Sequence, residues 1–187
     1  MKSIRLSIPD VVLVEPRLFE DERGYFFESF NLEKFQQAVD RDVFFVQSNE
    51  SLSVQNVIRG LHYQIERPQG KLVRVVEGAV FDVAVDLRTD SSTFGHWVGA
   101  TLSDDNNHQL WIPEGFAHGF QVLSREAKFQ YMVTEYWCPS YERCIRYDDP
   151  DIDIVWQQLA APDGHLLERS VSAKDQNGTA LVMAEVF

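Results

Sequence analysis

The chain contains only two cysteines, Cys138 and Cys144, among its 187 residues. No secretory hydrophobic segment opens the sequence, so we expect free thiols in a reducing, cytoplasmic setting, with a Cys138–Cys144 disulfide as the minor alternative. No apolar run approaches the roughly 18 residues that a membrane-spanning helix needs. We therefore predict a cytoplasmic protein that makes no membrane contact.

Basic residues are also scarce, with 17 Lys and Arg against 29 Asp and Glu and a net charge of -12. This balance argues against general nucleic-acid binding, which requires a basic surface. An anionic ligand would have to be held by a local cluster of cations. The segment 58–88 offers one, because Arg59, Lys71 and Arg74 lie beside His62 in an otherwise strand-like stretch.

Helical patterns are few. Residues 31–39 predict one helix, with Asn31 as its N-cap and with Leu32, Phe35 and Val39 on one face. Short helical turns are expected near residues 151–160, and the C-terminal tail is amphipathic. The helices should thus be short extensions at the two ends of the chain.

Alternating strands fill most of the rest. In residues 79–88, Phe81, Val83 and Val85 share one face, and Asp82 and Asp86 lie on the other. A strand, a turn at 21–24 and a second strand are expected in residues 11–30, and residues 44–53 predict a strand running into a polar loop. Many short strands with little helix between them predict an all-β antiparallel barrel or double-sheet jelly roll, in one domain spanning residues 1–187.

Two histidines stand out as candidate site residues. His62 lies in a strand close to two cations, although a structural histidine is the alternative. His118 follows a turn in "PEGFAH", a P-x-G-x-x-H pattern similar to the second motif of the cupin jelly roll, and either orders a loop or contacts a ligand. Two widely spaced histidines fall short of a zinc or iron ligand set, so we expect no metal site.

A third candidate region runs through "KFQYMVTEYW". Strand alternation places Tyr131, Val133, Glu135 and Trp137 on one face. Aromatic residues at this spacing are usually core, but Tyr, Glu and Trp together would suit the mouth of a barrel. There Tyr131 would offer a phenol donor and Trp137 a stacking surface.

Several motifs occur in order and together carry a resemblance: "DERGYFFESF", "QSNES", "IRGLHYQ", "QGKLVRVVEGAVFDVAVDLR", "FGHWVG", "QLWIPEGFAHGF" and "YDDPDIDIVW". From about residue 11 to 175 the chain resembles the dTDP-4-dehydrorhamnose 3,5-epimerases. The resemblance implies a cupin-type jelly roll, a homodimer and no metal or organic cofactor. It also implies conversion of dTDP-4-dehydro-6-deoxyglucose to dTDP-4-dehydrorhamnose.

The resemblance further implies roles for single residues. By motif, His62 is the general base, Asp175 its partner, Tyr131 the general acid and Lys71 the cation beside the keto oxygen. The implied substrate contacts are Arg23, Glu28, Gln47, Asn49, Arg59, His118, Trp137 and Glu142, of which Arg23 and Glu28 would reach the neighbouring subunit's site. Trp137 stands where the family usually has a tyrosine that stacks on thymine, and "SYERC" around Glu142 replaces a more usual "ESERG".

The implied epimerisation requires residues of these types. A ketone at C4 acidifies the protons on C3 and C5, so a base on one face of the ring and an acid on the other can invert each carbon through an enolate. Cations holding the diphosphate predict that binding weakens as salt rises. The alternatives are an epimerase acting at only C3 or C5 of a related sugar, a metal-dependent cupin enzyme, and a non-catalytic sugar-binding cupin.

Overall fold

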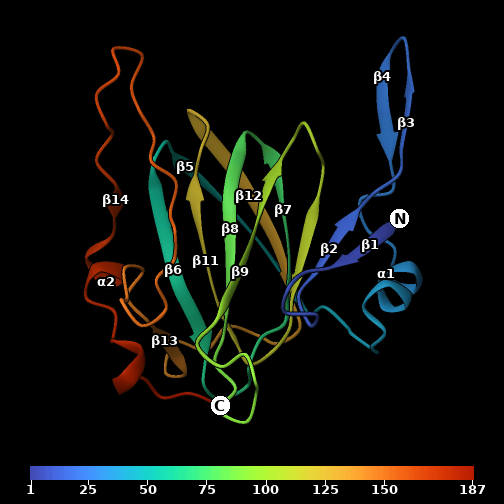
Figure 1. The fold of residues 1–187 in the computed structure, drawn as a ribbon. Coiled ribbons are helices and arrows are strands. Elements are labelled where there is room, and N and C mark those ends of the chain that lie inside the picture. Colours follow the sequence, from blue (N-terminus) through green and yellow to red (C-terminus); the bar gives the residue numbers. More distant parts are fainter.

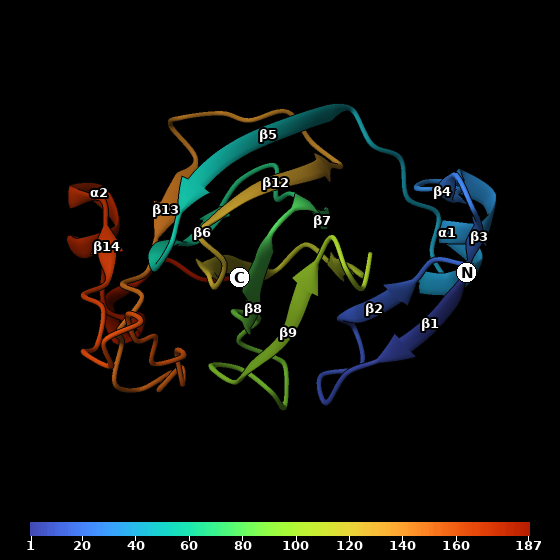
Figure 2. The same ribbon diagram turned by 90° about the horizontal axis from the view of Figure 1, so that it is seen from above.

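Two facing sheets form the body of the protein in a computed structural model that describes residues 1–187 (Figure 1, Figure 2). The first sheet has the order β1 (Lys2–Arg5), β2 (Val12–Glu15), β10 (Gln109–Ile112), β7 (Lys71–Glu77), β12 (Glu126–Val133) and β5 (Gln47–Val54). The second has the order β13 (Glu142–Cys144), β6 (Val57–Gln64), β11 (Phe116–Val122), β8 (Ala79–Asp86) and β9 (Trp97–Ser103), and the short β14 (Ser170–Val171) pairs with β6. The predicted double-sheet jelly roll is confirmed.

Strand β8 carries the alternation that the sequence predicts. Ala84 packs in the core between the sheets with Phe129, whereas Val83 and Val85 pack on the outer side of the second sheet with Trp156. Both faces of β8 are therefore covered, and all of its residues except Ala79 and Phe81 are buried. Burial of each face removes apolar surface from water and stabilises the fold by roughly 25 cal/mol per Å² of apolar surface buried.

The helices lie at the two ends of the chain, as expected. α1 (Leu32–Val39) begins at Asn31, whose side chain accepts a hydrogen bond from the Lys34 backbone N–H at 3.1 Å, and it buries Phe35 and Val39. α2 (Ala173–Gln176) and a 3₁₀ turn, η1 (Leu181–Met183), lie near the C-terminus. None of these helices has the length and apolar character needed to cross a membrane.

The helical turns expected in residues 151–160 are wrong. This segment forms a turn and then an irregular chain that ends in an isolated bridge at Ala160. Trp156 is buried against Phe81, and the Gln157 backbone N–H donates to the Gln121 side chain at 2.9 Å. Hydrogen bonds to barrel residues thus replace the helical ones that the local pattern suggested.

The boundaries near residue 47 also differ from the prediction. The apolar residues Phe44 to Val46 are not in a strand, whereas the polar run from Gln47 forms all of β5 and pairs with β12 along its whole length. Pairing satisfies the backbone groups of this polar run that face β12, and alternate side chains face the interior. The polar loop expected here is therefore a strand.

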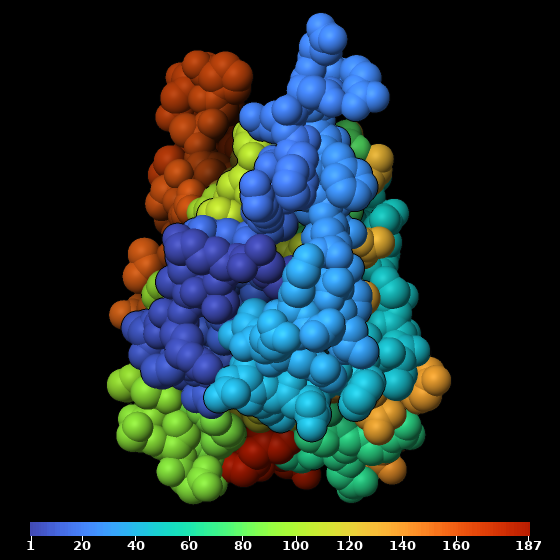
Figure 3. Space-filling view, turned by 90° about the vertical axis from the view of Figure 1, so that its right-hand side faces the viewer, coloured from blue at the N-terminus to red at the C-terminus, as the bar shows by residue number.

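A hairpin of β3 (Leu18–Asp21) and β4 (Gly24–Phe27) projects from the sheets (Figure 1, Figure 3). The turn predicted at residues 21–24 is confirmed. The strand expected before it is divided at Pro16, where a missing backbone N–H coincides with the exit of the chain from the first sheet. Phe26 and Tyr25 on the hairpin are 71% and 57% exposed.

Candidate functional site

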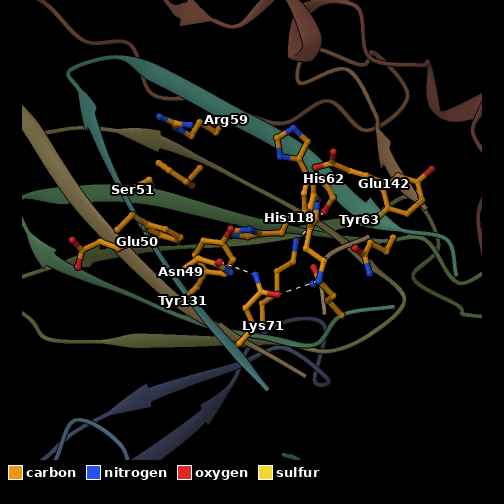
Figure 4. Close-up of a pocket in the computed structure, with 16 residues that line it drawn as sticks. Asn49, Glu50, Ser51, Arg59, His62, Tyr63, Lys71, His118, Tyr131 and Glu142 are labelled. Carbon is orange, nitrogen blue, oxygen red and sulfur yellow. Dashed lines mark hydrogen bonds between the residues drawn. The ribbon is translucent and has the colours of Figure 1, made fainter. Parts of the chain in front are cut away.

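A cavity of about 300 Å³ opens between the two sheets (Figure 4). Strands β5, β7 and β12 of the first sheet and β6 and β11 of the second supply most of its walls. Most of the predicted site residues line it, namely Gln47, Asn49, Arg59, His62, Lys71, His118, Tyr131, Trp137 and Glu142. Polar groups buried inside a β core lower the stability of the fold unless they have hydrogen-bond partners, so a polar cavity there indicates a ligand site.

An extra residue in β6 places Arg59 and His62 on one face. Three positions separate them along the chain, so regular alternation would point them in opposite directions. On the neighbouring β11, however, their partners are Phe120 and His118, which are two positions apart. This bulge turns both side chains into the cavity.

His62 is held by Asp175. The Nε2 atom of His62 lies 2.7 Å from Asp175 Oδ1, and Asp175 is 3% exposed. Burial by itself would raise the pKa of Asp175, but the hydrogen bond and charge of His62, with the N–H of Gly60 and the Ser172 hydroxyl, leave it lowered. An ionised Asp175 orients the imidazole and leaves Nδ1 of His62 without a protein partner.

Tyr131 comes from the opposite sheet. It lies on β12 and lines the same cavity as His62, and Figure 4 shows the two side chains well separated within it. Burial raises the pKa of Tyr131, so the phenol keeps its proton at neutral pH. An imidazole and a phenol thus approach one space from two sides, the arrangement that proton removal and return on opposite faces require.

Lys71 is the buried cation of the cavity. It is 7% exposed, and its Nζ donates to the backbone carbonyl of His62 at 3.2 Å. Burial lowers the pKa of Lys71 to about 8, while the charges of Asp82 and Glu142 oppose that shift. At neutral pH the ammonium group is therefore largely protonated. Of the cations named beside His62, Arg59 and Lys71 line this cavity and Arg74 does not.

Asp82, for which the sequence predicts a strand face and no function, is part of a buried ion pair in the structure. It is fully buried, and its two carboxylate oxygens lie 2.9 and 3.1 Å from Nε2 of His118. Burial raises the pKa of Asp82 and lowers that of His118. An aspartate in the middle of an otherwise apolar stretch of strand was the available signal for this buried pair.

The polar face of β5 forms another wall. Gln47, Asn49 and Ser51 point into the cavity, and Gln47 donates to Asn49 Oδ1 at 2.8 Å. Gln47 also accepts a hydrogen bond from the backbone N–H of Trp137, which stands at the mouth with 54% of its surface exposed. Ser51 was missed because β5 was expected to end in a loop.

Three predicted residues are placed elsewhere. Arg23 lies on the exposed hairpin and pairs with Asp21 at 2.6 Å, and Glu28 follows the hairpin and pairs with Lys34. Neither lines the cavity of its own chain. Glu135, expected to share a face with Tyr131 and Trp137, instead pairs with Arg67 at 2.6 Å, because β12 ends at Val133 and the alternation stops there.

Both cysteines are free, as predicted. Cys144 lies behind His62, with its Sγ 3.8 Å from Asp175 Oδ1. Burial and the charge of Asp175 raise the pKa of Cys144 to about 12, so it is a protonated thiol. His62, Cys144 and Asp175 are the one group of three metal-ligating side chains in the structure, with ligand atoms within 4.8 Å of one another, and His118 is not part of it.

Comparisons with known proteins agree with this geometry. The family model described as dTDP-4-dehydrorhamnose 3,5-epimerase matches residues 5–182. Enzymes of that name are 54% identical in Pseudomonas aeruginosa, covering 100% of this chain and 99% of the relative, and 52% identical in Shigella flexneri with the same coverage. The solved dTDP-6-deoxy-D-glucose-3,5-epimerase of Legionella pneumophila, in complex with dTDP-4-keto-L-rhamnose, superposes with a TM-score of 0.91 at 45% identity, covering 98% of this chain and 94% of that one.

Proposed function

Because this chain belongs to the dTDP-4-dehydrorhamnose 3,5-epimerase family, we propose that it converts dTDP-4-dehydro-6-deoxyglucose to dTDP-4-dehydrorhamnose by inverting C3 and C5. The observation that carries the proposal is the placement of His62 and Tyr131, which enter one cavity from opposite sheets. Residues 1–187 would act as one cupin-type domain in this reaction.

His62 would begin each inversion. Its Nδ1 atom, free of protein partners, takes a proton from C3 or C5, and Asp175 stabilises the resulting imidazolium through Nε2. The electron pair of the broken C–H bond moves into an enolate whose oxygen, at C4, is stabilised by the Lys71 ammonium group. Tyr131 then donates its proton to the opposite face of the carbon, and exchange with solvent restores both side chains.

The nucleotide would occupy the outer part of the cavity. Arg59 donates only from Nε to Ser53, at 2.9 Å, which leaves its terminal nitrogens for the diphosphate. Trp137 at the mouth offers an exposed ring for stacking on thymine. Gln47, Asn49, His118 and Glu142 supply further polar contacts from the cavity walls, in line with their positions there.

A second copy of the chain would complete the site. Arg23 and Glu28 lie outside the cavity of their own chain, and the hairpin beside them exposes aromatic rings. The edge strand β5 also exposes Leu52 and Val54, at 55% and 60%. Exposed apolar side chains and an unpaired strand edge are typical of protein interfaces. We therefore include a homodimer in which each hairpin contributes to the partner's site.

The test is a reaction with dTDP-4-dehydro-6-deoxyglucose in deuterated water, followed by NMR. Deuterium at both C3 and C5 with the rhamno configuration is expected. Deuterium at one carbon supports the single-position epimerase instead, and no exchange with intact dTDP binding supports a sugar-binding protein. Loss of turnover after chelation, restored by added metal, supports the metal-dependent cupin.

A further inference from the structure

Cys144 takes no part in the mechanism proposed above, yet it lies against the base. Strand β13 pairs with β6 so that Cys144 is directly opposite His62, and α2 brings Asp175 to the same point. These three residues come from three separate parts of the chain. Together they offer one nitrogen, one sulfur and one carboxylate oxygen within 4.8 Å of one another.

We propose that His62, Cys144 and Asp175 form a binding site for a thiophilic divalent cation such as Zn²⁺, and that the bound ion inhibits the enzyme. The inhibition rests on the proposed function of His62, whereas the binding rests on the geometry alone. The ion would be an inhibitor and not a cofactor. The proposed ion site does not include His118, because Nε2 of His118 is hydrogen-bonded to Asp82.

The three donor atoms lie within 4.8 Å of one another, so a tetrahedral ion requires one pair to open and the widest pair to close. Zn–N, Zn–O and Zn–S bonds of about 2.0 to 2.3 Å give edges of about 3.3 to 3.8 Å between ligands. Cys144 Sγ and Asp175 Oδ1 are 3.8 Å apart, whereas His62 Nε2 and Asp175 Oδ1 are 2.7 Å apart because a hydrogen joins them. Replacing that hydrogen by the ion requires this pair to open by roughly 0.6 Å.

The charges also balance. On binding, the Cys144 thiol releases its proton to water, so one thiolate and one carboxylate neutralise the two positive charges of the ion. Imidazole nitrogen and thiolate sulfur are ligands that Zn²⁺ prefers, and a water molecule would complete the fourth position.

The ion would inactivate the base through the tautomer of His62. A metal on Nε2 takes the lone pair of that nitrogen, so the remaining ring proton must reside on Nδ1. Nδ1 is the atom that has no protein partner and that would accept the substrate proton. A protonated Nδ1 cannot do so, and the hydrogen bond to Asp175 is lost at the same time.

The experiment uses full-length protein that has been stripped with a chelator and dialysed. Co²⁺ serves as the spectroscopic probe, because a thiolate ligand produces an intense charge-transfer band, and Zn²⁺ serves as the inhibitor in the epimerase assay. Cys144→Ser removes the sulfur with little change in volume. Cys138→Ser is the matched control, because Cys138 is the other free cysteine and is not part of the cluster.

The wild type and Cys138→Ser should show the charge-transfer band and equal inhibition by Zn²⁺. Cys144→Ser should keep basal turnover, lose the band and need on the order of tenfold or more Zn²⁺ for the same inhibition. Equal Zn²⁺ sensitivity of Cys144→Ser, or a Co²⁺ spectrum without a sulfur ligand in the wild type, overturns the proposal. If the protein lacks epimerase activity, the Co²⁺ spectrum still tests the site, so failure of the proposed function is distinguishable.

Discussion

The cavity between the sheets and the β3–β4 hairpin are built in opposite ways. In the cavity, His62 is hydrogen-bonded to Asp175, Lys71 to the His62 carbonyl and His118 to Asp82, so each side chain is held by a different secondary-structure element. On the hairpin, Arg23 contacts only Asp21, two residues away, and is exposed.

This difference separates two kinds of functional residue. A side chain held by distant elements is already ordered before a ligand arrives, so little entropy is lost on binding. A long side chain on an exposed hairpin has to be ordered by a partner or a ligand. We therefore expect cavity residues to control turnover and hairpin residues to control affinity, through the second subunit.

The largest expected effect is that of His62→Ala. Removing the base should lower kcat by about 10²- to 10⁴-fold, while dTDP binding, measured by calorimetry, stays near the wild-type value. His165→Ala is the control, because His165 is exposed and outside the cavity. If His62→Ala turns over at the wild-type rate, His62 is not the base. The expectation that cavity residues control turnover and hairpin residues control affinity is then wrong as well.

Lys71→Gln should follow, with a loss of about 10²- to 10³-fold in kcat from the missing enolate stabilisation. In the wild type, kcat/KM should fall as pH rises through about 8, because the lowered pKa of Lys71 makes its ammonium group lose the proton there. Lys128→Gln, at a surface lysine paired with Glu77, should leave both quantities unchanged. A flat alkaline profile contradicts the role of Lys71.

Arg23→Ala should have a smaller effect, on the order of tenfold in KM, and should reduce the salt dependence of binding. Arg146→Ala is the matched control, because Arg146 is partly exposed, lies outside the cavity and pairs with Asp148 two residues away, as Arg23 does with Asp21.

A mixing experiment sharpens this prediction. At a substrate concentration where both single variants are poor, subunit exchange between Arg23→Ala and His62→Ala should restore about a quarter of wild-type activity, since half the dimers then hold one intact site. No recovery after proven exchange means that the hairpin serves its own chain or no site at all.

The smallest effect on activity is expected for Asp86→Asn, because Asp86 stabilises the fold and lies outside the cavity. This buried carboxylate accepts hydrogen bonds from Arg88, Ser91 and Thr93. Burial alone would raise its pKa, but these bonds lower it to about 2. Because the folded pKa lies below the unfolded one, the stabilisation is present above about pH 4 and is lost as pH falls toward 2.

Asp86→Asn should therefore lower the free energy of unfolding at pH 7 by about 2 kcal/mol and flatten the acid limb of the unfolding curve. Kinetic constants of the folded variant should not change. Asp148→Asn, at an exposed ion pair with Arg146, should alter stability by less than about 1 kcal/mol. Urea titrations at pH 3 and pH 7 distinguish these outcomes.

Local pattern was a reliable guide where one face of an element meets the core. The 79–86 strand and the 32–39 helix have the periods of their structures, so the type of each element and the face of its apolar residues could be predicted, whereas the burial of Asp82 and Asp86 could not. It failed at β5, where a polar run forms a full strand, and beside Trp156, where the Gln121 side chain of the barrel holds an irregular chain. In both places the hydrogen-bond partners come from residues far away in sequence.

The candidate site divides in the same way. The motifs of the chain were enough to nominate His62, Lys71, Tyr131 and Asp175, because the types of residue needed for proton transfer recur in a recognisable order. The bulge that turns Arg59 and His62 to one side, the burial of Asp82 and the approach of Cys144 to Asp175 depend on strand register and on contacts across more than 30 residues. Such contacts arise only when the sheets pair and close, since no local preference of the chain encodes which strand will lie beside which.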